Sequence, residues 1–518
     1  MRPYAVILTL LGYFVAVLVL ARITARRGDF FATRSHRWWV VTLAMVSACM
    51  SGVSFVSVPG MVAGSGFGYL QMCIGFFLGY LVIAFVLSPL YFRLGVTSVY
   101  EYLDRRFGVT AHRWGAWLFF GSQLLRASLR LSLLCLTQQL LVFAPLGLPF
   151  VLNVVITVGI LLAYTWRGGV RSVIAADILR TACMVGAVVL SILFIGRTLP
   201  GGVFGTIADS GMTRVFWLDD PNAPQYFWKQ LLGGFFIVIA MTGMDQDMMQ
   251  RNLACRSLRD AQKNLVLSSL LQIVVIAGFL LLGVLLYAYA GNTGVAESGD
   301  ALFPAVAVNG GLPLIVGVLF VLGLAAASYG AGGSALTALT TAFVVDILPT
   351  PARKGAFSCT NPLRKANSCT KEGVFVHEYS RIRWMHLLIA AAMAVLVILF
   401  GYFMDRGALD AIYTVAGYTY GPILGLFAFG ILTRRTFQRT DPTDKPWGDE
   451  GRHARPDRAS AWKLAIALLG APVICLLLNH FSVQLLNGYR FGYELLPLNA
   501  ALTFLLLCIF SMPSAKCP

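Results

Sequence analysis

The sequence predicts an all-α membrane protein with many membrane-spanning helices, and three observations lead to this prediction. The 518 residues are 58% hydrophobic and only 12% charged, with a mean hydropathy of +0.75, which is too apolar for a water-soluble domain. Apolar runs of about 20 residues, the length that crosses a bilayer, recur along the whole chain. Basic residues gather in alternate loops, as they do when those loops face the cytoplasm.

The apolar runs define about thirteen spans, whose order fixes the expected topology. In approximate bounds they are 4–23, 38–62, 69–94, 117–144, 150–166, 173–195, 228–249, 265–290, 313–347, 384–404, 411–432, 461–481 and 493–512. The basic loops place the N-terminus outside and the C-terminus in the cytoplasm. We therefore expect a multi-pass protein of the inner or plasma membrane.

The second span is expected to be a broken helix. Residues 45–62 read MVSACMSGVSFVSVPGMV and include Gly52, Pro59, Gly60 and four serines. Glycine and proline weaken a helix and free backbone groups. Inside a bilayer those groups need protein or cavity water as partners, and transporters use such breaks to hold ions and substrates. The alternative is that the small residues only let neighbouring helices approach closely.

Other function classes are disfavoured by the same sequence. The net charge of +17 resides mostly in loops, so it does not indicate nucleic-acid binding. The ten cysteines lie mostly in apolar spans and are predicted to be small packing residues. No Ser/His/Asp, HExxH or paired-carboxylate constellation is visible, so we do not expect an enzyme.

Five segments, in order and on the expected spans, resemble the sodium:solute symporter family. They are CMSGVSFVSVPG (49–60), GGVRSVIAADILR (168–180), MDQDMMQRNLACRSLRDAQK (244–263), SALTALTTAFVVDI (334–347) and YGPILGLFAFGIL (420–432). The pattern is nearest to the proline- and sialic-acid-transporting members. The resemblance implies the LeuT fold, in which two inverted repeats of five helices, each with a broken first helix, surround a central site.

This resemblance divides the chain into six parts. They are an N-terminal helix and cytoplasmic loop (1–37), the first repeat (38–196), an extracellular loop (197–227), the second repeat (228–433), a cytoplasmic linker (434–460) and two C-terminal helices (461–518).

The resemblance also implies where sodium would bind. Backbone carbonyls would come from Ser47 and Met50, and side-chain hydroxyls from the positions of Gly330 and Ala331. The last two residues have no hydroxyl, so the side-chain ligands are missing here. Asp177 matches the family's buried aspartate on the inward ion path, where it would relay sodium or a proton. Its alternative role is that of a hydrogen-bond partner at a helix start.

Arg130 is the leading candidate for substrate binding. It lies well inside the span 117–144, where an unpaired arginine costs several kcal/mol, and its planar fork suits a carboxylate. Its position resembles that of the substrate-carboxylate arginine in the sialic-acid transporters. The alternatives are a structural ion pair with Asp177 or Asp245, or a side chain that reaches the membrane surface. Arg126 lies one helical turn away on the same face.

The family alignment suggests further substrate contacts, although each is more often a packing or helix-end residue. They are Ser54, Gln71, Met241, Thr242 and Asp245. Met241 stands where sugar-transporting members place an aromatic gate, so a stacked sugar is not expected.

The sequence therefore predicts a secondary active transporter that works by alternating access. The expected substrate is a small organic solute, anionic or zwitterionic because of Arg130. Sodium is the coupling ion implied by the family, and no cofactor beyond it is expected. Proton coupling, uncoupled transport and a transport-inactive membrane sensor are the alternatives. The expected partners are the solute, sodium or a proton, and the lipid bilayer, but not nucleic acid.

Overall fold

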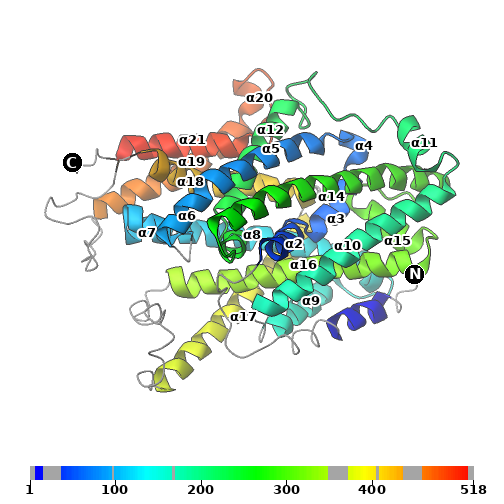
Figure 1. The fold of residues 1–518 in the computed structure, drawn as a ribbon, viewed down its shortest axis with the longest axis horizontal. Helices are drawn as coiled ribbons and strands as arrows, with labels where there is room; N and C mark the ends of the chain where they lie inside the picture. Colours follow the sequence, from blue (N-terminus) through cyan, green and yellow to red (C-terminus); the bar gives the residue numbers. More distant parts are fainter. Residues whose placement is uncertain are drawn as a thin grey trace.

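The computed structural model describes residues 6–15, 37–95, 99–165, 170–347, 372–403, 408–433, 435 and 458–511 (Figure 1). Within these ranges the chain is helical and contains no β-strand, as predicted. After a first helix, Val6–Val15, the elements are α2 (Trp38–Cys49), α3 (Gly52–Gly60), α4 (Val62–Ser65), α5 (Tyr69–Val82), η1 (Ile83–Leu87), α6 (Ser88–Leu94), α7 (Glu101–Phe107), α8 (Val109–Gln138), η2 (Gln139–Phe143), α9 (Phe150–Thr165), α10 (Val170–Thr198), α11 (Gly202–Asp209), α12 (Phe227–Val238), η3 (Ile239–Gly243), α13 (Gln246–Leu253), α14 (Leu258–Thr293), η4 (Gly299–Ala301), α15 (Leu302–Asn309), α16 (Leu314–Ala342), η5 (Phe343–Ile347), α17 (Glu372–Phe403), α18 (Ala408–Leu432), α19 (Arg458–His480), α20 (Ser482–Leu485) and α21 (Leu495–Phe510).

Seven helices of the described part are long and apolar enough to cross a membrane, and two bent helix pairs raise this number to nine. Shorter apolar helices, such as Val6–Val15 and Leu495–Phe510, coincide with further predicted spans. The integral membrane class is thus supported, while the count of thirteen and the inverted repeat stay predictions.

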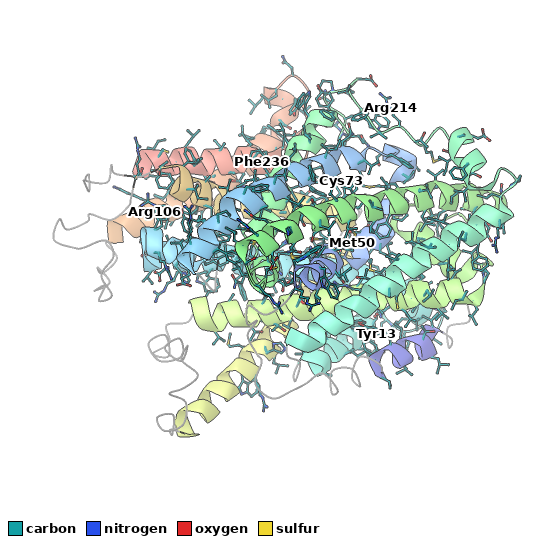
Figure 2. The ribbon with its side chains drawn as sticks, viewed as in Figure 1. Tyr13, Met50, Cys73, Arg106, Arg214 and Phe236 are labelled. Atoms are coloured by element: carbon teal, nitrogen blue, oxygen red, sulfur yellow. The ribbon has the colours of Figure 1, made fainter. Side chains whose placement is uncertain are left out.

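The broken helix α2/α3 lies in the middle of the bundle, with α8, α10, α14 and α16 around it (Figure 1). Its side chains form part of the core, since Met45, Phe55 and Val56 are fully buried. Elsewhere α5 packs on α12, α10 on α16, and α18 on α21 (Figure 2).

The first break falls between α2 and α3, which are bent by 58° relative to each other. Ser51 caps α3, because its Oγ accepts a hydrogen bond from the Ser54 N–H at 3.4 Å. A Cβ on Gly52 would lie 2.4 Å from the Ser328 Oγ, so glycine allows α16 to approach here. Pro59 lies inside α3. The predicted break is therefore present, at the serine and glycine and not at the proline.

A second break separates α12 and η3 from α13, with a bend of 68°. The predicted span 228–249 is thus two helices. Asp245 caps α13, because its Oδ1 accepts from the Asp247 N–H at 2.9 Å.

Helices α5 and α12 cross through glycines. A Cβ on Gly75 would lie 2.3 Å from the Leu231 carbonyl oxygen, and one on Gly234 would lie 2.3 Å from the Met72 carbonyl oxygen. Both distances are far below a van der Waals contact, so the two backbones touch directly. Small residues at such crossings are typical of helix packing in membranes.

Candidate functional site

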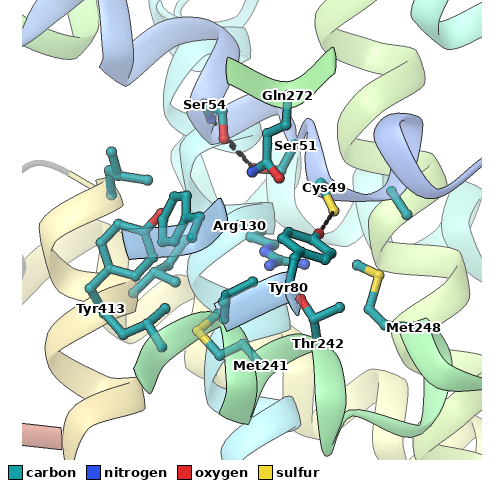
Figure 3. A pocket seen from close by; sticks show the side chains of 16 residues that line it. Cys49, Ser51, Ser54, Tyr80, Arg130, Met241, Thr242, Met248, Gln272 and Tyr413 are labelled. Atoms are coloured by element: carbon teal, nitrogen blue, oxygen red, sulfur yellow. Dashed lines mark hydrogen bonds between the residues drawn. The ribbon is translucent and has the colours of Figure 1, made fainter. Parts of the chain in front are cut away.

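A cavity of about 80 Å³ lies beside the first break, between α2, α3, α5, α8, α12, η3, α13, α14 and α18 (Figure 3). Its polar lining includes Ser51, Ser54, Tyr80, Arg130, Thr242 and Gln272. Apolar walls are supplied by residues such as Phe76 and Met241. We call this space the central cavity; its volume suits a small solute, since a single water needs about 10–15 Å³.

Arg130 brings a positive charge to the central cavity from the middle of α8 (Figure 3). Its Nε is buried and has no hydrogen-bond partner among the described residues. In the described part of the chain, no carboxylate forms an ion pair with Arg130. An arginine in this setting is energetically unfavourable until an anion approaches it.

Asp245, which the sequence suggested as a possible partner of Arg130, pairs with Arg126 instead. The Arg126 Nη2 donates to the Asp245 Oδ2 at 2.8 Å, and both side chains are almost fully buried. The Tyr420 hydroxyl donates to the same oxygen at 3.1 Å, and the Arg126 guanidinium also contacts Gln123 and lies over the Tyr420 ring. Asp245 therefore compensates the charge of Arg126, and among the described residues no carboxylate pairs with Arg130.

The predicted substrate contacts separate into two groups. Ser54, Met241 and Thr242 line the central cavity. Asp245 does not line it, and its oxygens are engaged by Arg126, Tyr420 and the α13 cap.

Gln71 lies outside the central cavity and is fully buried at the start of α5. Its amide donates to the carbonyls of Gly68 and Gln225, and its Oε1 accepts from the Trp217 N–H, all at 3.0–3.1 Å. The structure thus gives Gln71 a role in fastening the loop 197–227 to α5.

Several residues of the cavity lining were not anticipated from the sequence, and two of them carry polar groups that matter for binding. Gln272 lies on α14, and its Oε1 is buried with no partner among the described residues. Tyr80 lies on α5, and its hydroxyl is 3.1 Å from the Cys49 Sγ (Figure 3). The available signal for Gln272 was a lone amide within the apolar span 265–290.

The four predicted sodium positions lie on α2, its end and α16, but a guanidinium lies between these helices. The Arg180 Nε donates to the Ser47 Oγ at 2.9 Å. A Cβ on Gly330 would lie 2.9 Å from the Arg180 Nη1. Met50 ends α2, with its N–H bonded to the Val46 carbonyl, and Ala331 is only partly buried on α16. The side chain of Asp177 lies outside the described residues.

Two discontinuous helices around a polar cavity, within a bundle of apolar helices, are typical of helical membrane transporters. Sequence comparison identifies the family: residues 30–439 match the sodium:solute symporter family, to which the chain belongs. Its relatives are transporters and not enzymes, as predicted.

Similar proteins include the sodium/sialic acid symporter SiaT of Proteus mirabilis, which is 23% identical over 82% of this chain and 84% of its own length. The Homo sapiens sodium/iodide cotransporter is 24% identical over 80% of this chain, and the mouse (Mus musculus) sodium-coupled monocarboxylate transporter 1 is 26% identical over 76%. The match spans only 62% of each of these two relatives.

Comparison with solved structures supports the fold. The substrate-bound outward-open state of a Na+-coupled sialic acid symporter matches with a TM-score of 0.73, covering 99% of each chain at 18% identity. Mhp1, a nucleobase-cation-symport-1 family transporter, matches with a TM-score of 0.52 over 93% of this chain and 94% of its own, at 12% identity. These likenesses confirm an all-helical fold shared with solved membrane transporters, while the inverted repeat stays a prediction.

Proposed function

We propose that this chain is a secondary transporter that moves a small organic anion or zwitterion by alternating access, with Arg130 binding the solute's carboxylate. The observation that supports this proposal is the positive charge of Arg130 in the central cavity, which has no ion-pair partner among the described residues because Asp245 is paired with Arg126.

The chemistry of the cavity matches such a solute. A carboxylate offers two oxygens to the guanidinium fork, and each hydrogen bond to a charged group contributes about 1.5–3 kcal/mol. The unpartnered Gln272 Oε1 is an acceptor for a hydroxyl or ammonium group on the same solute. Phe76 and Met241 would contact its apolar part.

The two helix breaks are the places where helices that line the cavity bend sharply. Their position supports the proposal of alternating access. Breaks at 50–51 and 244–245 lie next to the cavity-lining residues Ser51 and Thr242. Helices that are already interrupted can pivot there without losing internal hydrogen bonds. Sodium is the proposed driving ion because the relatives are described as sodium-coupled.

The proposal can be tested by ligand-induced stabilisation of the purified protein. Small monocarboxylates, zwitterionic amino acids and neutral sugars would be screened by thermal unfolding, since a ligand at a hundredfold excess over Kd adds about 2.7 kcal/mol of stability. We expect carboxylate-bearing compounds to stabilise the wild type and Arg130→Ala to remove the shift. Arg113→Ala, an exposed arginine on the same helix, is the matched control.

A well-folded Arg130→Ala protein that keeps the full shift would refute the carboxylate role. Uptake of the radiolabelled hit into proteoliposomes then separates transport from sensing. Binding without uptake would favour the transport-inactive sensor.

A further inference from the structure

Arg180 is an almost fully buried arginine whose side chain extends from α10 to the first broken helix and to α16. Only 3% of its surface is exposed. Its Nε donates to the Ser47 Oγ on α2 at 2.9 Å, and a Cβ on Gly330 of α16 would lie 2.9 Å from its Nη1. Helix α10 packs on both α2 and α16, so the guanidinium lies at a three-helix contact.

We propose that the Arg180 guanidinium is a resident cation that fills the place predicted for sodium between α2 and α16, so that no sodium ion binds there. The inference rests on the proposed transporter function and specifies its ion site. Any sodium that drives transport would bind at a different site.

Two features of the sequence have one explanation in this arrangement. Sodium needs oxygen ligands, whereas a guanidinium carries only donors. The two positions expected to provide hydroxyls are Gly330 and Ala331, which offer none. Gly330 leaves space for the Arg180 Nη1, because a Cβ there would lie only 2.9 Å from that nitrogen. The absence of hydroxyl ligands at these two positions and the presence of the Arg180 guanidinium beside them are thus consistent with each other.

The exchange preserves charge but changes how the site works. A guanidinium carries the same +1 charge as sodium. Unlike sodium, it is covalently attached to α10 and cannot leave with the solute. The contact between α2, α10 and α16 therefore holds its cation throughout the transport cycle and couples no ion gradient.

The test measures thermal unfolding without any organic solute, in NaCl, KCl and choline chloride at equal ionic strength. Three variants are compared with the wild type: Arg180→Gln, Arg180→Lys, and Arg180→Gln combined with Gly330→Ser and Ala331→Ser. We expect Arg180→Gln to lower the Tm in choline, and Arg180→Lys to lower it less because the charge is kept. The triple variant should show a sodium-specific, saturable rise in Tm that exceeds the wild-type response.

Two results would overturn the inference. One is an equal sodium response in the wild type and a folded triple variant. The other is an Arg180→Gln protein that is as stable in choline as the wild type, and this comparison decides the matter even when the triple variant does not fold. Because no solute is present, this outcome is independent of the Arg130→Ala experiment, so the two proposals can fail separately.

Discussion

The buried pair Arg126–Asp245 gives the sharpest prediction for stability. Asp245→Asn keeps a good capping residue for α13 but removes the negative charge that compensates Arg126. Both side chains are no more than 4% exposed, and the Nη2–Oδ2 distance is 2.8 Å. Removing one partner of such a pair costs about 3–5 kcal/mol, because the other charge is left buried and uncompensated.

The double variant Arg126→Gln/Asp245→Asn tests the reason for this loss. No buried charge is left uncompensated in it, so its loss of stability should be smaller than that of Asp245→Asn alone, whereas independent effects would add to about 6–10 kcal/mol. The assay is chemical unfolding in mixed micelles, with the free energy of unfolding obtained for the wild type, both single variants and the double variant.

The exposed pair Glu101–Arg105 is the matched control. Its N–O distance is 2.6 Å, but its side chains are 32% and 42% exposed. Glu101→Gln should therefore cost less than about 1 kcal/mol. Additive losses in the double variant, or an Asp245→Asn loss as small as that of the control, would refute the argument.

Two further predictions concern packing and thiol reactivity. Gly75→Ala should destabilise the protein by about 1–3 kcal/mol, because its Cβ meets backbone atoms of α12 that cannot rotate away; Gly278→Ala on α14, where a Cβ has open space, should not be destabilising in the same unfolding assay. Burial raises the pKa of the Cys255 thiol, in the turn between α13 and α14, to about 12, and Asp260 adds to the rise. At pH 8 about one thiol in ten thousand is ionised, so maleimide labelling of Cys255, followed by peptide mapping, should be very slow in the folded protein and fast after unfolding in SDS; equal rates would contradict this.

The sequence was sufficient to predict the helical membrane class and the first helix break. Both depend on local composition: long apolar runs for the spans, and Gly52 with its flanking serines for the break. The exact position of the break was less accessible, because Pro59 is the stronger helix breaker by propensity. The structure accommodates Pro59 inside α3, and it is Ser51 that caps the helix.

Arg130, Ser54, Met241 and Thr242 line one cavity, whereas Asp245 pairs with Arg126, and the sequence could not show which arginine Asp245 would meet. Arg126 and Arg130 lie on one helix face, and only the tertiary position of the second helix break decides which of them meets Asp245, 119 positions from Arg126. The contact of Arg180 with Ser47 spans 133 positions. Such long-range contacts leave no local pattern, so the segment 168–180 directed attention to Asp177 and not to the arginine at its end.

The glycine crossing of α5 and α12 limits how these two helices can move relative to each other. Helices whose backbones interlock without intervening side chains cannot slide along one another unless they first separate, and separation would open a void along the whole contact. These two helices therefore move as a single rigid body. Because Tyr80 comes from α5 and the π-helical turn after α12 supplies Met241 and Thr242, these residues form one wall of the cavity whose shape is fixed by the glycine crossing.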